Sequence, residues 1–287
     1  MNSSIVKNLW LGRVVYSVDG SSVQLMDTKK NQKVFPQPKT QKKLWFPCNE
    51  SHGASESQYC LWENFCTAHP DEQDAKTVSR VLNQFVKEGL LLADRAFCSY
   101  EILYRASSAN MDVAMRLHQM RAKGFTLRQG KKIGKNERLV TWIKPKKKPA
   151  HCELDDAEWD AVADEMEMRI IACWFVDRDG KKKRLLIATT LLDNETYNWL
   201  DIVNLYTTRW DIGVRLRDVK TTMKMEGLRV TTPDMARKSF AMAMLACNLV
   251  SSIAHEGARR ADVEPYLMSY KEILDWINSA APNFFYA

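Results

Sequence analysis

Residues 206–220 read YTTRWDIGVRLRDVK, and two stripes of side chains run along this stretch at helical spacing. Apolar residues recur at intervals of four, three and four, at Ile212, Leu216, Val219 and Met223. The last of them lies just beyond the quoted stretch. This spacing is typical of one apolar face of an α-helix. The stretch is therefore predicted to be an amphipathic helix.

The second stripe is polar and has a glycine within it. Its members lie within about 60° of one another on a helix of about 100° per residue, and they are Tyr206, Arg209, Gly213 and Lys220. A glycine inside a helix costs roughly 0.5–1 kcal/mol relative to alanine. Gly213 therefore either serves close packing or stands where a different residue belongs.

Charge and composition favour an intracellular protein with an acidic partner. The chain has 287 residues, a hydrophobic fraction of 45%, a net charge of +7 and a pI of about 9.0. Nucleic acid is the usual acidic partner of such a chain, although a merely basic soluble protein has the same charge. Seven cysteines without regular spacing argue against a disulfide framework and for a reducing cytoplasm. The sequence shows no signal peptide and no apolar run of membrane-spanning length.

Two aspartates accompany apolar, strand-like runs in the first hundred residues. Residues 10–27 predict a strand, a turn at Asp19-Gly20 and a second strand, because Asp-Gly is a strong turn signal. The apolar run Leu90–Ala93 predicts a buried strand with Asp94 at its carboxyl end. Helices are predicted on either side of this strand, at residues 76–88 and 99–109.

The middle of the chain changes charge abruptly and then predicts a β-hairpin. Residues 116–150 contain 12 Lys or Arg and a single acidic residue, Glu137, whereas residues 151–169 contain 8 Asp or Glu. The runs RIIACWFV and RLLIATTLL are strand-like and lie on either side of Asp179-Gly180, a turn signal. This region is therefore predicted to be rich in β-strands and to have a basic surface.

From Asn198 onward the pattern is mostly helical, and residues 235–256 are apolar enough for a buried core helix. The order of strands, helix, strand, helix, β-rich segment and helices predicts an α/β or α+β fold with an insertion. We expect three parts, which are a first part of the core at residues 1–115, a basic β-rich insertion at 116–192 and a helical second part of the core at 193–287.

The polar residues allow two kinds of chemistry, each with a plainer alternative. Asp19 and Asp94, at neighbouring strand ends, could hold Mg²⁺ or Mn²⁺, which bind oxygen ligands. A tight turn and a surface ion pair are the alternatives for these two carboxylates. Arg209 and Lys220 could bind phosphates. The Arg209 guanidinium would form two parallel hydrogen bonds, and the Lys220 ammonium would act as a point charge. The alternative for them is a solvated, charged helix face.

Several motifs occur in a specific order between about residues 10 and 255. They are VDGSSVQLMDT, NQKVFPQP with QKK and WFP, LLADRAFCSY, RLHQ, and Y-x2-R-W-x-I-G-x6-K followed by KTTM. Together they resemble bacterial insertion-sequence transposases of the DDE superfamily, in the YREK-motif, IS-four-like branch. The resemblance implies an α/β fold with an RNase H-like core, a mixed sheet flanked by helices, interrupted by a β-rich insertion.

The resemblance also assigns roles to residues. The first two catalytic carboxylates correspond to Asp19 and Asp94, and the third, a glutamate, corresponds to the position of Gly213. The residues that position DNA at the transposon end correspond to Tyr206, Arg209 and Lys220. The family uses a two-metal site with Mg²⁺ or Mn²⁺, in which three carboxylates hold the ions that act on a DNA phosphodiester.

No neighbouring carboxylate replaces the missing one. Asp211 and Asp218 lie about 140–160° around the helix from position 213, and Glu226 is more than three turns further along. We therefore expect a DDE transposase with impaired activity, whose family cleaves DNA at insertion-sequence ends and joins them to target DNA. A non-catalytic DNA-binding or inhibitory relative is the alternative, and a decaying remnant that does not fold is a third.

Residues 48–70 depart from the family pattern. They are polar and contain cysteines where apolar strands of the central sheet are expected, so we hypothesise a replaced or frame-shifted segment that does not complete the sheet. The candidate zinc ligands of this region fit no usual spacing, and they are Cys48, His52, Cys60, Cys66 and His69. Only 18 residues precede Asp19, so we expect an N-terminal truncation.

Basic residues between positions 128 and 148 suggest contact with the DNA backbone, with a solvated insertion surface as the alternative. The candidates with the clearest charge clustering are Lys131, Lys132, Lys146, Lys147 and Lys148. The expected partners are transposon-end and target DNA, with a homodimer on DNA and no membrane. The expected location is the bacterial cytoplasm, at the nucleoid.

Overall fold

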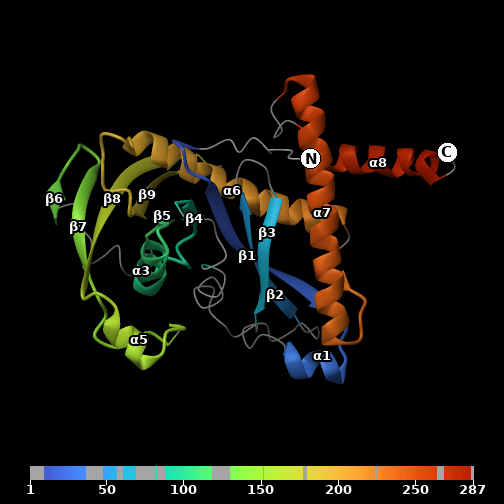
Figure 1. The fold of residues 1–287 in the computed structure, drawn as a ribbon, viewed down its shortest axis with the longest axis horizontal. Coiled ribbons are helices and arrows are strands. Elements are labelled where there is room, and N and C mark those ends of the chain that lie inside the picture. Colours follow the sequence, from blue (N-terminus) through green and yellow to red (C-terminus); the bar gives the residue numbers. More distant parts are fainter. Residues whose placement is uncertain are drawn as a thin grey trace. The chain divides into compact units, whose positions relative to one another are not determined.

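The computed structural model describes residues 10–36, 48–56, 61–68, 82, 88–117, 130–150, 152–176, 180–223, 225, 227–263 and 268–285 (Figure 1). The description excludes the side chains of residues 21–22, 48–56, 61–68, 210–220 and 281–285. The chain divides into two compact units, Met1–Asp19 with Glu72–Trp210 and Gly20–Asp71 with Asp211–Ala287. The division falls within strand β1 (Val15–Leu25) and within helix α6 (Trp199–Thr222).

The first unit is built on a mixed sheet. In spatial order its strands are β1, β4 (Leu90–Ala93), β5 (Asp112–Arg116), β9 (Lys182–Thr189), β8 (Glu165–Val176), β7 (Glu137–Ile143) and β6 (Lys131–Lys132). β1, β4 and β5 run parallel, whereas each later neighbour in this order is antiparallel. The parallel strands form the α/β part, and the antiparallel ones belong to the β-rich region.

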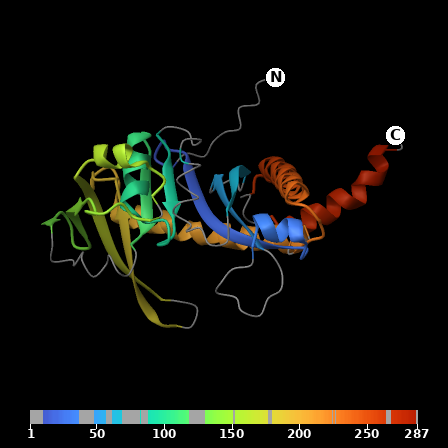
Figure 2. The same cartoon turned by 90° about the horizontal axis from the view of Figure 1, so that it is seen from below.

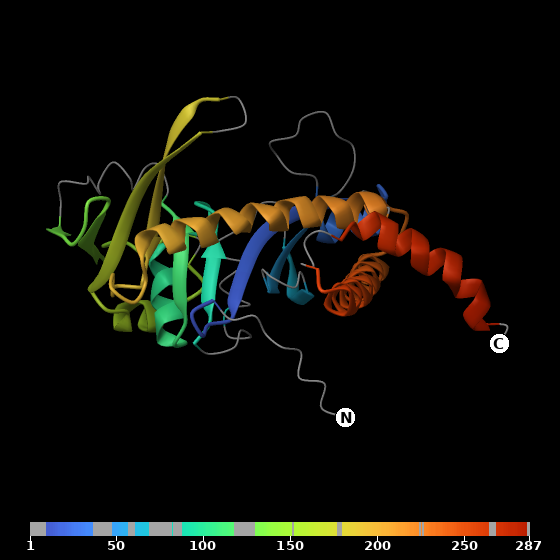
Figure 3. The same cartoon turned by 90° about the horizontal axis from the view of Figure 1, so that it is seen from above.

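Helices cover both faces of the parallel strands. In Figures 2 and 3, orange α6 and green α3 (Tyr100–Ser108) lie on opposite sides of these strands. Beneath α6, Leu90 and Leu92 pack with Ile202 and Leu205 in one apolar cluster. β4 reads LLLA and is buried at every position, as expected for a strand covered on both faces. The predicted buried strand before Asp94 and the helix after it are therefore confirmed.

The predicted hairpin is also present. β8 and β9 pair in register from Arg169↔Thr189 to Val176↔Lys182. A short helix, α5 (Asp156–Ala161), precedes β8 and begins with a capping box. In that box Asp155 accepts from the Glu158 backbone N–H, while the Glu158 carboxylate accepts from the Asp155 backbone N–H.

The second unit contains the remaining elements. They are the end of β1, α1 (Lys29–Val34), β2 (Cys48–Glu56), β3 (Leu61–Ala68), the end of α6, β10 (Gly227–Leu228), α7 (Pro233–Ala261) and α8 (Tyr270–Phe285). The end of β1 pairs with β10, and Val23 packs with Phe240, Met244 and Cys247 of α7. The predicted helical character of the C-terminal part is confirmed.

β1 corrects the prediction of a turn at Asp19-Gly20. The strand is continuous from Val15 to Leu25, and Gly20 is absent from the described glycines with positive φ. The start of β1 pairs with β4 and its end with β10. Pairing with neighbouring strands therefore outweighs the local turn preference of Asp-Gly.

Residues 48–70 correct a second prediction. β2 and β3 pair antiparallel from Glu50↔Ala68 to Glu56↔Leu61, and the strand order of this unit is β3-β2-β1. The hypothesis that the segment does not join the sheet is therefore wrong, because backbone pairing does not require Val or Ile. The side chains of the candidate zinc ligands lie outside the described residues, as does most of the predicted helix 76–88.

Helix 235–256 is confirmed as part of α7, but it is not a fully buried core helix. Phe240, Met244 and Cys247 are buried, whereas Met242 and Leu249 are well exposed. An apolar residue count does not distinguish a helix buried all round from one with a second, exposed apolar face. The division at residues 115 and 192 stays a prediction.

Candidate catalytic site

Asp19 and Asp94 occupy matching positions on adjacent parallel strands. β1 and β4 pair with Val15 beside Leu90, an offset of 75 residues, and hold this offset over three pairs. The same offset (94 − 19 = 75) places Asp19 at the level of Asp94, which directly follows β4. Alternate residues of a strand share a face and neighbouring strands lie about 4.8 Å apart. Both carboxylates therefore fall on the sheet face that Leu90 shares with α6.

Two side chains of α6 lie against this pair of aspartates. Arg209 is buried, and its Nη1 lies 3.7 Å from Oδ2 of Asp19. The Arg209 guanidinium also lies over the ring of Tyr206, 5.7 Å from its centroid. The Tyr206 hydroxyl donates a hydrogen bond to the carbonyl oxygen of Ala93 at 3.3 Å, next to Asp94. The structure thus brings together four of the residues that the sequence singles out.

Tyr206 is fully buried, and this changes its chemistry. Burial raises the pKa of Tyr206 to about 12, the Asp94 charge adds to this effect, and the Arg209 charge opposes it. The hydroxyl therefore stays protonated at neutral pH and acts as a donor. Through its hydrogen bond to Ala93, the Tyr206 hydroxyl holds the backbone next to Asp94. Contact of Tyr206 with DNA, which the resemblance implies, stays a prediction.

Arg116 is a member of this cluster that the sequence reasoning did not single out. β4 and β5 pair with Ala93 beside Met115, an offset of 22 residues, which places Arg116 at the level of Asp94. Its charge lowers the pKa of Tyr206, so it is close enough to act on this site. The available signal was its position directly after the apolar residues of β5, just as Asp94 follows β4.

The remaining predicted residues are placed less completely. Gly213 and Lys220 lie within helix α6, and the side chain of Lys220 is outside the described ones. The predicted DNA-binding lysines of the insertion are all exposed, and Lys148 pairs with Asp156. Lys131 and Lys132 form β6, and Lys146 and Lys147 follow β7.

The residues that the structure describes do not by themselves complete a two-metal site. Among the described residues no group of three His, Cys, Asp or Glu side chains is placed to hold a metal ion. Asp19 and Asp94 supply two carboxylates, and one of them is already paired with a guanidinium. Two divalent ions usually require more oxygen ligands than this pair provides.

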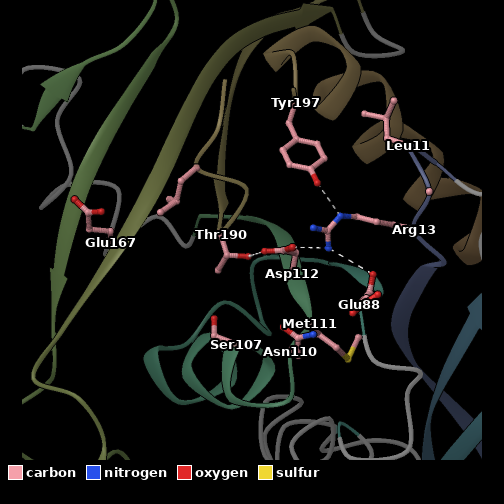
Figure 4. Close-up of a pocket in the computed structure, with 12 residues that line it drawn as sticks. Leu11, Arg13, Glu88, Ser107, Asn110, Met111, Asp112, Glu167, Thr190 and Tyr197 are labelled. Atoms are coloured by element: carbon pink, nitrogen blue, oxygen red, sulfur yellow. Dashed lines mark hydrogen bonds and ion pairs between the residues drawn. The ribbon is translucent and has the colours of Figure 1, made fainter. Parts of the chain in front are cut away.

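A polar cavity of about 570 Å³ lies at the other, amino-terminal end of the parallel strands (Figure 4). Arg13 forms an ion pair with Asp112 at 2.6 Å and donates from Nε to the Tyr197 hydroxyl at 3.0 Å. The Thr190 hydroxyl donates to the other Asp112 oxygen at 2.6 Å. These groups satisfy one another, and ligands of such sheets bind at carboxyl ends of strands. We therefore interpret the cavity as structural.

Comparisons with known proteins identify the family of the chain. A family described as "Transposase DDE domain" matches residues 10–249. The chain is 24% identical over 258 residues to the transposase InsG for insertion sequence element IS4 of Escherichia coli (strain K12). The aligned region covers 84% of this chain and 52% of the relative. The chain thus spans about half the length of that relative.

A solved structure supports the fold. The cryo-EM structure of the piggyBac transposase synaptic complex with hairpin DNA matches with a TM-score of 0.54 and 10% identity, over 91% of this chain and 51% of that chain. The mixed sheet with helices on both faces is accordingly an RNase H-like α/β fold. No helix among the described residues is long and apolar enough to cross a membrane. With the family match extending over most of its length, the chain belongs to the transposase DDE domain family.

Proposed function

We propose that this chain is an insertion-sequence transposase whose catalytic site is impaired because one carboxylate is missing. The observation that carries the proposal is the register of Asp19 and Asp94, which puts two carboxylates side by side beneath α6. Family members cleave DNA at the ends of the element and join the ends to target DNA. The helical period puts position 213 on the face that carries Tyr206 and Arg209, where the family has its third carboxylate.

Mg²⁺ or Mn²⁺ is the cofactor that the family implies, and Asp19 with Asp94 would hold it. Such an ion polarises a phosphodiester and lowers the pKa of bound water. With two carboxylates the site falls short of a two-metal site, so we derive no cleavage step for this chain. Retained activity is therefore expected to be low or absent.

Arg209 supports DNA as the substrate of this site. Its Nε is buried and has no hydrogen-bond partner among the described residues. Buried donors are normally satisfied, and a guanidinium is well suited to a phosphate oxygen. Arg116 adds a second cation at the level of Asp94. A DNA phosphate at this site would pair with these two cations, which would offset its repulsion by the two aspartates.

The second candidate function is a non-catalytic DNA-binding or inhibitory protein, which occupies transposon ends or pairs with intact transposase. A homodimer on DNA is proposed for either function. The exposed lysines of the β-rich region favour the second candidate, because backbone contacts need no metal. We expect either protein at the bacterial nucleoid, where its DNA is. Salt-dependent DNA binding without metal-dependent cleavage, even with the third carboxylate restored, would favour this candidate.

The test is nicking of supercoiled plasmid with Mn²⁺ by the chain as given and by its Gly213→Glu variant. Cleavage by the variant alone would support a catalytic scaffold that lacks a single ligand. Adding Asp94→Asn to the Gly213→Glu variant is the matched control, and it should abolish cleavage. Equal cleavage by both proteins would overturn the proposed impairment.

A further inference from the structure

Helix α7 has an exposed apolar stripe on the side opposite its core. Met242, Leu245 and Leu249 are 64%, 60% and 63% exposed. At about 100° per residue these three side chains fall within about 60° of one another. The side chains that α7 buries, such as Phe240 and Cys247, lie on the other side of the helix. A contiguous apolar stripe of this kind marks an interaction surface.

The stripe continues into a cavity that α7 shares with α8. The cavity has a volume of about 820 Å³. Leu249 and Ile253 line it from α7, and Trp276, which is 61% exposed, lines it from α8. One flank of the stripe is therefore hollow and apolar, so it can receive a long side chain from a partner.

Charged residues at the two ends of the stripe mirror each other about position 247. Lys238 lies nine residues before this position and Glu256 nine residues after it. Asp234 and Arg260 lie thirteen residues before and after it. Each of these two pairs has opposite signs. Leu245 and Leu249 lie two residues on either side of the same centre. The stripe therefore matches, in charge and in apolar character, a second copy of itself that runs in the opposite direction.

We propose that a second copy of this chain packs its α7 antiparallel against this stripe, about a twofold axis at position 247. In that arrangement Lys238 faces Glu256 of the partner subunit, and Asp234 faces Arg260 of the partner subunit. Leu245 faces Leu249 of the partner subunit, so the apolar centre is buried. A twofold interface uses the same surface on both copies. A helix at such an interface therefore has to be complementary to an antiparallel copy of itself.

The spacing along α7 suits such a helix pair. The positions at the seam alternate intervals of three and four, and they are Met235, Lys238, Met242, Leu245, Leu249, Ser252 and Glu256. This is the spacing of the contact seam of two helices that pack side by side. Met242 of the partner subunit faces Ser252, which lines the cavity, so its side chain can enter the hollow flank.

Existing ion pairs are compatible with this interface. Glu256 accepts from Arg259 at 2.8 Å and from Arg260 at 2.6 Å, and Lys238 pairs with Asp234 at 2.8 Å. A carboxylate has about four acceptor sites, so Glu256 can also accept from Lys238 of the partner subunit. The interface needs no DNA and no metal, and it is independent of the proposed catalytic function.

Sedimentation of the full chain without DNA tests this surface. We expect a concentration-dependent dimer, which the double substitution Leu245→Glu with Leu249→Glu converts to a monomer. Met26→Glu, at an exposed apolar residue outside α7, is the matched control and should leave the dimer unchanged. A chain that is monomeric at all concentrations, or a dimer that the double substitution leaves intact, would overturn the proposal.

A charge exchange tests the antiparallel register. Lys238→Glu and Glu256→Lys each place like charges at two symmetric contacts, so each variant alone should dimerise roughly tenfold more weakly. Mixing the two variant proteins restores opposite charges at both contacts and should restore the dimer. Circular dichroism checks that both variants keep their helices. Two weakened variants that do not recover on mixing would contradict this register.

Discussion

The guanidinium of Arg209 lies 3.7 Å from the carboxylate of Asp19, and Arg209 is buried while Asp19 is partly exposed. Arg209 therefore compensates one of the two carboxylates that would otherwise repel each other. A divalent ion bound at Asp19 would have to share that carboxylate with the guanidinium. If the proposed function holds, this ion pair links DNA binding, metal binding and the charge balance of the site.

Replacing Arg209 tests its role toward DNA. Arg209→Met should weaken DNA binding by roughly tenfold and reduce the salt slope by about one, because the proposed phosphate contact would be lost. Fluorescence anisotropy with labelled duplex DNA at several salt concentrations measures both effects. Arg229→Met is the control, because Arg229 is exposed and lies outside the cluster. An unchanged salt slope for Arg209→Met would argue against a phosphate contact.

The buried hydroxyl of Tyr206 predicts a pH dependence of stability. Its folded pKa is raised to about 12, above the ordinary value of 10. The folded state therefore holds the proton more tightly, and the resulting stability is complete below pH 10 and is lost as pH rises through 12. Its size is on the order of 3 kcal/mol.

The Tyr206→Phe variant isolates this effect from other titrating groups. At neutral pH the variant should be less stable by about 1 kcal/mol, because the hydrogen bond to Ala93 is lost. Between pH 10 and 11.5 the wild type should lose more stability than the variant. Urea denaturation at both pH values measures the difference. Parallel losses in the two proteins would show that Tyr206 titrates normally.

A buried ion pair predicts a large stability effect in the β-rich region. Arg169 is fully buried, and its Nε donates to Glu137 at 2.8 Å. Glu137→Ala leaves this guanidinium without its carboxylate and should lower the free energy of unfolding by about 3–5 kcal/mol. Glu137→Gln, which keeps an acceptor, should cost less than Glu137→Ala.

Glu165→Ala is the control for the ion pair, because Glu165 is exposed on the neighbouring strand β8. It should change the free energy of unfolding by no more than about 0.5 kcal/mol. Thermal and urea denaturation of the three variants give the ranking. If Glu137→Ala were as mild as Glu165→Ala, the ion pair would not support the sheet.

The parts of the fold that local sequence determines were predictable. The run LLLA before Asp94 is apolar at every position, so it indicates a strand covered on both faces. The β8–β9 hairpin has long apolar runs on either side of a turn signal. Asp19 and Asp94 were singled out by their positions at the ends of apolar runs and by the resemblance, and only the strand register shows that they lie level with each other.

The parts that depend on distant pairing were not predictable. The turn expected at Asp19-Gly20 gives way to a continuous strand, because neighbouring strands pair along β1. Arg116 was counted with the basic insertion, since its level beside Asp94 depends on the β4–β5 register. The exposed stripe of α7 could not be predicted from the sequence, because Met242 and Leu249 have the same apolar character as the buried residues of α7.

The most direct test of the central claim is Mn²⁺ binding, measured by electron paramagnetic resonance on the chain as given and on the Gly213→Glu variant. If Asp19 and Asp94 form a metal pair that lacks one carboxylate, the variant should bind Mn²⁺ at least about tenfold more tightly. Adding Asp94→Asn to that variant should remove the gain. Equal affinity of the chain with and without the Gly213→Glu change would contradict the claim that position 213 completes this site.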